Sequence, residues 1–260
     1  MKKLITKIIY SIFESAVIIK YIEKFTRSKV IKNMPFGVNP ISDIHCSIEQ
    51  YNFNILFDVG ANVWQTENTY AKQLPNSNIY CFEPINDSFS ILKNNIIGKH
   101  THCHNIAFGE KEESIEIKIN KEKTSDVFSL NNNEQEAHSA NDYLTYKIEV
   151  DTLDNFTTKH NIEYINFLKV DTEGYDLKVI KGAKNLLLTQ KIDFIEVEVS
   201  MNKFNDFHVS FVEMYQYLKR MDYHIFGVYE QFQEFGRKPF LRRSNMVYIS
   251  KNKIDNNWLK

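Results

Sequence analysis

The stretch Ile55-Leu-Phe-Asp-Val-Gly-Ala-Asn62 decides the fold of this chain. Apart from one acid, its first five residues are apolar and include β-branched and aromatic side chains, which predicts a buried strand that ends at Val59. Gly60 then breaks the strand, and residues 64–73 can form a helix. A strand, a glycine turn and a helix in this order can hold a nucleotide-type cofactor, because a turn without a Cβ lets the backbone approach its ligand.

A second strand is predicted shortly after this unit. The segment Asn78-Ile-Tyr-Cys-Phe-Glu-Pro84 is again mostly apolar and again ends near an acid. Glu83 follows the glycine turn by roughly 20 residues, where a Rossmann-type fold places a carboxylate on the ribose hydroxyls of its cofactor. Asp58 alone could be an ordinary strand-end or helix-capping acid. The pair of Asp58 and Glu83 at this spacing favours a cofactor site.

The glycine turn also indicates which kind of cofactor to expect. Dinucleotide sites have the pattern G-x-G-x-x-G, which cradles a pyrophosphate at a helix N-terminus. Here the turn is Gly60-Ala-Asn-Val-Trp-Gln65, with a single glycine, so a nicotinamide-dependent oxidoreductase is disfavoured. A cofactor without phosphates fits better, and S-adenosylmethionine combines a ribose, an adenine and an amino acid without any phosphate.

Six segments together resemble the FkbM-type S-adenosylmethionine-dependent methyltransferases. In chain order they are Phe57-Asp-Val-Gly-Ala-Asn62, Cys81-Phe-Glu-Pro84, Asn105-Ile-Ala-Phe-Gly109, Val150-Asp-Thr-Leu-Asp154, Phe167-Leu-Lys-Val-Asp-Thr-Glu-Gly174 and Ile195-Glu-Val-Glu-Val199. Their order and spacing match the family, and the resemblance covers residues 51–250. It implies a doubly wound α/β, Rossmann-like methyltransferase sheet with a terminal antiparallel strand pair.

The resemblance also implies a set of cofactor contacts at the strand ends and in one long loop. These residues are Asp58, Gly60, Ala61, Asn62, Glu83, Pro84, Asn105, Ala107 and Asp126. The chain departs from the family at Trp64, where a second glycine is usual. A large side chain there could crowd the methionine end of the cofactor. The alternative hypothesis is therefore a non-catalytic binding or scaffold protein whose cofactor site is altered at Trp64.

Composition sets broad bounds on the protein. The chain has 260 residues, of which 43% are hydrophobic and 25% charged, enough for one large α/β domain. A net charge of −1 gives no global electrostatic argument for a nucleic-acid partner. The cysteines Cys46, Cys81 and Cys103 are few and scattered, which indicates a reducing compartment, and we expect a cytoplasmic protein.

Residues 1–29 differ from the rest of the chain. Apolar residues recur there at helical spacing beside an excess of basic residues, which predicts an amphipathic helix. Lys7 and Glu14 interrupt the apolar run, so neither a signal peptide nor a membrane span is predicted. The helix could lie on the inner face of an anionic membrane, or pack on the catalytic domain or on a second subunit.

The organisation expected from these patterns has two parts. Residues 1–50 would hold the amphipathic helix and a connector over residues 33–50, and residues 51–260 the methyltransferase domain. Within the latter, strands and helices alternate, which predicts βαβ units and a parallel sheet. Beyond the first units, the expected strands are 101–105, 164–170 and 191–199, an inserted antiparallel pair 114–119 and 146–150, and a closing pair 223–229 and 246–249. The expected helices are 87–95 with Asp87 as N-cap, 151–160, 176–188 and 207–221, and a long polar loop covers 120–142.

The segment Lys169-Val-Asp-Thr-Glu-Gly174 is the second cluster of chemistry. Lys169, Asp171 and Glu173 share a parity, so in an extended chain they point to one side, and Glu198 ends the next strand. They could form a structural ion-pair cluster, because buried charges need partners. They could equally be catalytic residues: Asp171 would orient or deprotonate a substrate hydroxyl, and Glu173 would hold a neighbouring group or a metal. The sequence does not choose among Asp171, Glu173 and Glu198 as the base.

No metal site is indicated by the sequence, although a divalent cation would be compatible with the chemistry. His100, His102 and His104 would share one face of a strand. Same-face positions along a strand lie about 7 Å apart, which is wide for three ligands of one ion. We therefore expect these histidines to be ordinary polar residues of a strand near the sheet edge.

The acceptor is the least defined part of the prediction. The resemblance points to methylation of a hydroxyl on a small molecule, sugar or glycan, such as a bacterial surface polysaccharide or its precursor. Aromatic residues are dense over 223–240 and could stack on a sugar or pack on the core, while Arg242 and Arg243 could meet a phosphate-bearing acceptor. A homo-oligomer is compatible with all of this, and the sequence does not decide it.

Overall fold

A computed structural model describes residues 35–120 and 143–258 of the chain. The chain divides into two compact units, residues 1–38 and 39–260, and the architecture below is that of the second unit. The amphipathic helix expected over residues 1–29 lies outside the described residues, as do Asp126 and nearly all of the loop expected over 120–142. Within the described part of the chain, every helix is too short or too polar to cross a membrane.

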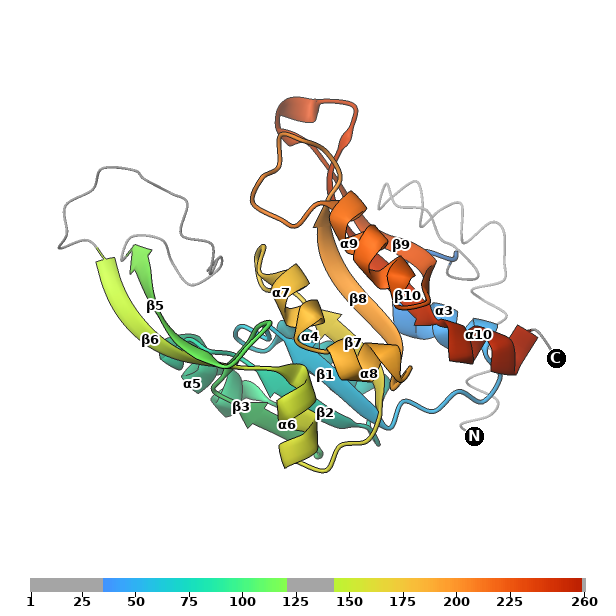
Figure 1. Cartoon of the computed structure of the whole chain (residues 1–260), viewed down its shortest axis with the longest axis horizontal. Helices are drawn as coiled ribbons and strands as arrows, with labels where there is room; N and C mark the ends of the chain where they lie inside the picture. Colours follow the sequence, from blue (N-terminus) through green and yellow to red (C-terminus); the bar gives the residue numbers. More distant parts are fainter. Residues whose placement is uncertain (1–34, 121–142, 259–260) are drawn as a thin grey trace, which may run out of the picture. The chain divides into compact units, whose positions relative to one another are not determined.

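A seven-stranded sheet forms the centre of the second unit (Figure 1). Its strands lie in the order β3-β2-β1-β7-β8-β10-β9, with β10 antiparallel to both neighbours and the other pairings parallel. Their bounds are β1 Ile55–Val59, β2 Asn78–Phe82, β3 Thr101–His104, β7 Ile165–Val170, β8 Ile192–Ser200, β9 Tyr223–Gln233 and β10 Leu241–Ser250. The predicted doubly wound Rossmann-like sheet with a terminal antiparallel pair is confirmed.

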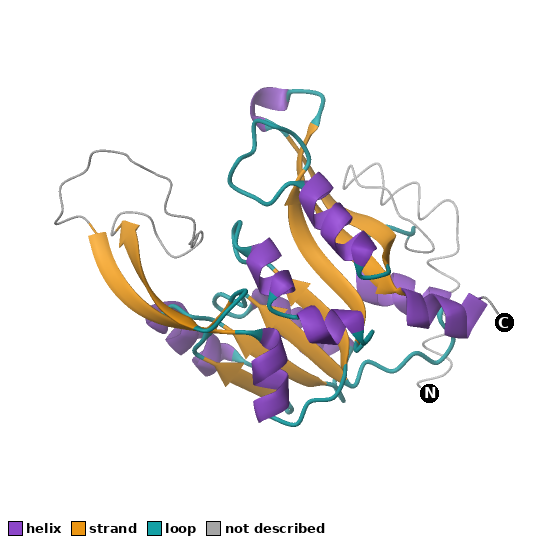
Figure 2. Ribbon diagram, viewed as in Figure 1, coloured by secondary structure: helices purple, strands orange, loops and turns teal. Residues whose placement is uncertain are grey.

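Helices cover both faces of this sheet (Figure 2). On one face lie α6 Leu153–Lys159, α7 Asp176–Lys181, α8 Lys184–Leu188 and α9 Phe211–Arg220. On the other lie α3 Pro40–Ser47, α4 Gln65–Gln73, α5 Asn86–Asn95 and α10 Lys251–Trp258. Strands β7 and β8 are buried along their whole length, because a central parallel strand meets helices on both faces.

A smaller sheet of three strands, β4 Ala107–Phe108, β5 Glu113–Asn120 and β6 Tyr143–Asp151, adjoins the large one (Figure 1). The predicted antiparallel pairing of β5 with β6 is confirmed. Tyr146 on β6 donates a hydrogen bond to the Asp87 carboxylate at 2.7 Å. The expectation that Asp87 caps α5 is wrong, because the helix begins at Asn86 and Asp87 lies in its first turn.

The connector expected over residues 33–50 contains a helix, α3. Asn39 caps it by accepting a hydrogen bond from the Ser42 backbone N–H at 2.8 Å, and Pro40 starts it. Ile41 and Ile44 are buried in the core. The proline that suggested a connector is therefore the first residue of a packed helix.

Two other helices differ from expectation. The helix expected over 176–188 is divided into α7 and α8, because the Asp154 carboxylate accepts hydrogen bonds from the backbone N–H groups of Asn185 and Leu186 and so starts a new helix there. The helix expected over 207–221 begins only at Phe211, with Ser210 as its N-cap. Residues 207–210 consequently belong to a loop, which matters for the site.

Candidate active site

A cavity of about 320 Å³ lies at the carboxyl ends of β1, β2 and β7. Its lining comes from the turns after these three strands and from residues 106–108. In an open α/β sheet this edge is where ligands bind, because the strands end there and the loops diverge. Below, this space is called the first cavity.

The turn after β1 brings three strand ends together. The backbone N–H groups of Gly60 and Ala61 both donate to the Phe82 carbonyl at 3.0 Å, and the Asp171 N–H donates to the Val59 carbonyl at 2.9 Å. Gly60 has a φ of 84°, and a Cβ at this position would lie 1.9 Å from the Asp171 carbonyl oxygen. Only glycine therefore allows β1 and β7 to end so close to the cavity.

Glu83 presents a buried carboxylate to the first cavity, with 6% of the residue exposed. One carboxylate oxygen accepts a hydrogen bond from the Asn62 N–H at 3.1 Å and the other from the Ile85 N–H at 2.8 Å. Burial raises the pKa of Glu83 to about 7 although both hydrogen bonds act to lower it. Each carboxylate oxygen retains a second lone pair, so the group can still accept from a ribose diol. The residues present thus fit S-adenosylmethionine, for which Glu83 would hold the ribose.

Lys169 joins two acids at the end of β7. Its Nζ lies 2.9 Å from Asp171 Oδ2 and 3.7 Å from Asp58 Oδ1. Burial alone would lower the pKa of Lys169, but Asp171 and Asp58 raise it above its usual value, so this amine carries its charge. Burial would also raise the pKa of Asp171, yet the contact with Lys169 lowers it. Asp171 is therefore an ionised partner of Lys169 and a weak proton acceptor.

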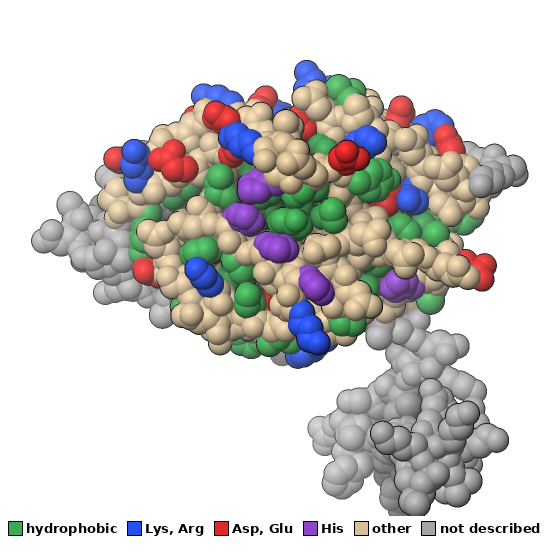
Figure 3. Space-filling view, turned by 90° about the horizontal axis from the view of Figure 1, so that it is seen from below, with side chains coloured by type: hydrophobic (Ala, Val, Ile, Leu, Met, Phe, Trp, Pro, Cys, Tyr) green, Lys and Arg blue, Asp and Glu red, His purple; other side chains and the backbone are tan. Residues whose placement is uncertain are grey.

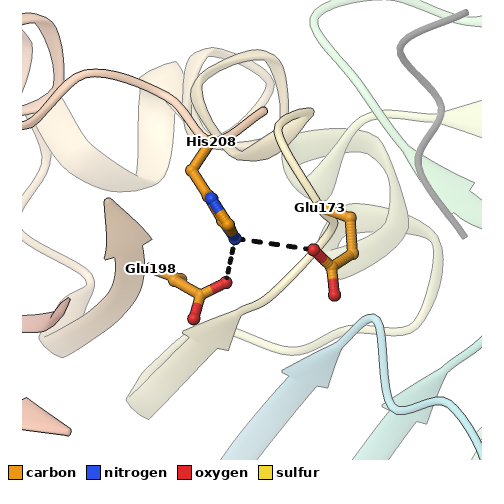
Figure 4. Close-up of side chains that lie close together, drawn as sticks. All are labelled: Glu173, Glu198 and His208. Atoms are coloured by element: carbon orange, nitrogen blue, oxygen red, sulfur yellow. Dashed lines mark ion pairs between the residues drawn. The ribbon is translucent and has the colours of Figure 1, made fainter. Parts of the chain in front are cut away.

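A second group of side chains lies beside this pair: Glu173, Glu198 and His208 (Figure 4). His208 Nε2 lies 2.7 Å from Glu198 Oε2 and 3.6 Å from Glu173 Oε2. The other oxygen of Glu198 contacts the guanidinium of Arg243. Burial, followed by the neighbouring Asp171 charge, raises the pKa of Glu173 to about 7. Burial also lowers the pKa of His208, which keeps its imidazole neutral at neutral pH.

The loop between β8 and α9 fixes the position of His208. Asn205, only 3% exposed, donates through Nδ2 to the Arg242 carbonyl at 3.1 Å, and its Oδ1 lies 3.1 Å from His208 Nδ1. The Ser200 hydroxyl donates to the carbonyl groups of Asn202 and Asn205. The imidazole is thus held by a connected set of hydrogen bonds that begins at the end of β8.

A second cavity of about 560 Å³ opens on this loop. It is lined by Gly174 and by residues 200–213 except Phe204, and His208 forms part of the lining. Glu173 lines the first cavity and contacts His208, which lines the second. The group Glu173, Glu198 and His208 therefore stands where the two cavities meet.

Comparison with known proteins gives the family. A model of the FkbM methyltransferase domain matches residues 58–225, more than half of the chain. The chain belongs to the FkbM methyltransferase family. The matched range includes the first cavity, His208 and both carboxylates beside it.

Two relatives illustrate the likeness. The crystal structure of Methyltransferase FkbM from Methylobacillus flagellatus KT is 15% identical with a TM-score of 0.50, and the match covers 77% of this chain and 44% of that one, which shows the shared fold. "Methyltransferase 1" of Beauveria bassiana (strain ARSEF 2860) is 23% identical over 144 residues, covering 50% of this chain and 58% of the relative. The chain thus spans about half the length of these relatives.

The cofactor residues implied by the FkbM resemblance fall into two groups. Gly60, Ala61, Asn62, Glu83, Pro84 and Ala107 all line the first cavity. Asp58 is completely buried behind it, and among the described atoms its carboxylate oxygens have only the ion pair with Lys169. Asn105 is also outside the lining and donates to the carbonyls of Glu83 and Pro84, so it supports the loop that carries Glu83.

Trp64, the departure from the family pattern, lies outside the lining of the first cavity and is 38% exposed. It is the N-cap residue of α4, and the lining is formed instead by its neighbours Asn62, Gln65 and Thr66. The structure gives no support to the idea that this tryptophan fills the methionine end of the cofactor site. The hypothesis of a blocked, non-catalytic site loses the observation on which it was based.

His208 is the functional candidate that sequence reasoning missed. It was included in the expected helix 207–221, and no local pattern connects it to Glu173 or Glu198. Arg243 was considered for a phosphate-bearing acceptor, whereas the structure places it on Glu198 and over the Phe232 ring at 4.0 Å. The available hint was an isolated histidine shortly after a strand that carries an acid near its carboxyl end.

The histidines of β3 pack against an aromatic ring. Histidine side chains gather in a row on one face of the molecule (Figure 3). His102 and His104 stack on Tyr80 at 4.8 and 6.2 Å between ring centroids. Within residues 35–120 and 143–258, only Glu173, Glu198 and His208 bring three metal-ligating atoms close together. The interpretation of the strand histidines as ordinary polar and packing residues fits this geometry.

Proposed function

We propose that this protein transfers a methyl group from S-adenosylmethionine to a hydroxyl group of a sugar or glycan. Family membership supports the reaction class. The observation that carries the proposal is the junction at Glu173, which places a cavity suited to the cofactor beside a second cavity with a proton-accepting group between them. A transferase for two substrates needs this arrangement, because both reactants must be held in line.

The first cavity would hold the cofactor through the residues that close it. Glu83 would accept hydrogen bonds from both ribose hydroxyls, and the Gly60 turn would lie against the cofactor without a side chain between them. When bound, the cofactor supplies an electrophilic methyl group on a sulfonium centre. Asp171 and Lys169 line the same cavity and give that end of it an ordered pair of opposite charges.

The acceptor oxygen must be positioned at the junction and must lose its proton. The pKa of Glu173 is raised to about 7 by burial, which places a proton acceptor near the operating pH. His208 is neutral at this pH, and its contact with Glu198 orients the ring. Of the acids predicted as bases, Glu173 therefore suits proton transfer better than Asp171, whose charge is held by Lys169.

The second cavity suits a hydroxyl-rich acceptor. Its lining mixes the amides of Asn202 and Asn205 with the rings of Phe207 and Phe211. Hydrogen-bonding side chains beside aromatic rings can bind a sugar along both its hydroxyls and its apolar face. A bacterial surface polysaccharide or its precursor is the acceptor class that we propose on this basis.

Calorimetric titration with S-adenosylmethionine tests the cofactor part of the proposal. Replacing Glu83 by Ala removes the ribose contact, so the affinity should fall roughly tenfold or more, as for loss of hydrogen bonds to a charged group. Glu163→Ala is the matched control, because this exposed glutamate precedes β7 at the opposite edge of the sheet. Equal affinity of all three proteins would remove Glu83 from the ribose site.

Transfer itself is tested by incubating the protein with isotope-labelled S-adenosylmethionine and a set of monosaccharides, nucleotide sugars and polysaccharide fragments. We expect S-adenosylhomocysteine release together with a methyl ether on the acceptor, identified by mass spectrometry and NMR. A methyl ester or an N-methyl product would contradict a hydroxyl acceptor. Cofactor binding without transfer to any acceptor in the set would contradict the proposed sugar or glycan class.

A further inference from the structure

We propose that Glu173, Glu198 and His208 form a site for one divalent metal cation that binds the acceptor. The proposal rests on the proposed function and deepens it, because it names what holds the acceptor oxygen at the junction of the two cavities. It goes beyond the sequence, in which the ligands are distributed over the turn after β7, the end of β8 and the following loop.

The geometry is that of a ligand set. One oxygen of each carboxylate and one imidazole nitrogen all lie within 4.8 Å of one another. Ligand atoms bind such cations at about 2.0–2.2 Å, so atoms around one ion are separated by up to about 4.4 Å. A cation between the three atoms would require only small side-chain adjustments, and the three side chains already point toward one another (Figure 4).

One of the two tautomers of His208 directs a lone pair toward the two carboxylates. Asn205 Nδ2 donates to the Arg242 carbonyl and lies 3.0 Å from His208 Nδ1, and Oδ1 of the same amide lies 3.1 Å from that nitrogen. In the tautomer that carries its proton on Nδ1, this Oδ1 accepts from the ring. With the proton on Nδ1, Nε2 is an acceptor that faces Glu198 Oε2 at 2.7 Å. Two acceptors at that distance repel each other unless a proton or a cation lies between them. A ring nitrogen fixed by an amide on its other side is typical of metal-bound histidine.

The charges at the site also favour a cation. Two carboxylates, Glu173 and Glu198, face His208, and the Arg243 guanidinium contacts the Glu198 oxygen that does not contact the ring. Glu198 Oε2, which faces His208, is therefore the carboxylate oxygen that could bind a cation. With both acids ionised, the two carboxylates and the one guanidinium carry a net charge of −1, which favours the binding of a divalent cation.

The donor set indicates the kind of cation and its role. Two carboxylate oxygens with one imidazole suit Mn²⁺, Fe²⁺ or Zn²⁺ and leave further coordination positions open. An acceptor hydroxyl in the second cavity, which His208 lines, could occupy an open position. Coordination lowers the pKa of a bound hydroxyl, so with a cation bound the proton would leave to water, and Glu173 would act as a ligand instead of as the proton acceptor.

Titration of the chelator-treated protein with Mn²⁺, followed by electron paramagnetic resonance, tests the site directly. We expect one equivalent of bound Mn²⁺ and a loss of affinity of roughly tenfold or more in Glu198→Gln and in His208→Ala, because each removes a ligand. His102→Ala is the matched control: this exposed histidine is stacked on Tyr80, away from the three ligands, and its loss should leave Mn²⁺ binding unchanged.

Other results of the Mn²⁺ titration would contradict the metal site. Equal Mn²⁺ affinity of wild type, Glu198→Gln and His208→Ala, or no binding at all, would overturn the site and leave a hydrogen bond between the neutral His208 ring and Glu198. S-adenosylmethionine binding is measured on the same samples, and we expect the ligand variants to keep it within about threefold of wild type. Failure of the cation site with intact cofactor binding would leave the proposed function standing, whereas loss of cofactor binding in wild type would remove that function independently of the metal.

Discussion

The two cavities that meet at Glu173 are built in different ways. The first is closed by the backbone: the Gly60 and Ala61 N–H groups bind the Phe82 carbonyl, and Asp171 binds Val59 across the strand ends. The second is shaped by side chains of the loop after β8, such as Asn205, whose amide links distant parts of the chain. The contrast teaches that a cavity between strand ends follows from the strands themselves, whereas a cavity on a loop depends on individual side chains.

The largest effect is expected where the backbone is closest. Gly60→Ala would place a Cβ 1.9 Å from the Asp171 carbonyl oxygen in a residue with φ of 84°, so the ends of β1 and β7 must separate. We expect a loss of about 3 kcal/mol or more in the free energy of unfolding. The corresponding fall in melting temperature is roughly 6–12 °C, and cofactor binding should be lost with it.

Gly236→Ala, in the segment between β9 and β10, provides the matched control. Gly236 also has a positive φ, 74°, but a Cβ there would meet nothing within 4 Å. This change introduces backbone strain alone, about 1 kcal/mol, which calorimetry or circular dichroism would report as a shift of roughly 2–4 °C. Similar losses in the two variants would contradict the view that close backbone contact defines the first cavity.

The same contrast explains what the sequence could predict. The strand bounds of β1 and the residues Gly60 and Glu83 follow from short local patterns, since strand, turn and acid are neighbours in the chain. Asn105 was predicted as a cofactor contact at a strand end, but its side chain turns back to the carbonyls of Glu83 and Pro84. Position at a strand end is thus predictable, and the direction of a side chain depends on which unpaired backbone group lies within its reach.

His208 shows more clearly what the sequence could not predict. Its relation to Glu198 and Glu173 depends on the loop that leads into α9, because this helix starts at Phe211 and not at Phe207. Helix starts depend on capping, and a serine hydroxyl that accepts from the Val212 N–H set the boundary here. A shift of the helix start by a few residues converted a presumed helical histidine into a loop residue at the site.

An effect of intermediate size is expected from a substitution at Glu196, one of the acids of β8. Glu198 stands at the junction, whereas Glu196 lies behind it, accepts a hydrogen bond from Asn245 at 3.0 Å and lines neither cavity. Burial raises the pKa of Glu196 to about 7, against which Lys169 and Asn245 act. Glu196→Gln keeps an acceptor for Asn245, so we expect it to alter stability while leaving cofactor and Mn²⁺ binding unchanged.

The raised pKa of Glu196 determines how the effect of Glu196→Gln on stability changes with pH. A carboxyl group that binds its proton more tightly in the folded state contributes stability below its unfolded pKa of 4.5, and this is lost as the pH rises through about 7. Glu196→Gln should therefore stabilise the protein at pH 8, by on the order of 1–3 kcal/mol, and change it little at pH 4. Urea unfolding at both pH values measures this, with the exposed Glu163→Gln as control. A variant less stable than wild type at pH 8 would mean that the attraction between Glu196 and the Lys169 charge outweighs the cost of burial.

The smallest effect is expected at Trp64, on the rim of the backbone-built cavity. Its side chain is 38% exposed and lies outside the lining, so Trp64→Ala should change the dissociation constant for S-adenosylmethionine by less than about threefold. Trp258→Ala, which removes the other tryptophan of the chain, 46% exposed, from α10, controls for general effects of losing a large ring. A marked gain in affinity at Trp64 alone would show that the ring enters the cavity in solution. In that case even the part of the site that the strands determine would be regulated by one side chain, and the contrast between the two cavities would be one of degree.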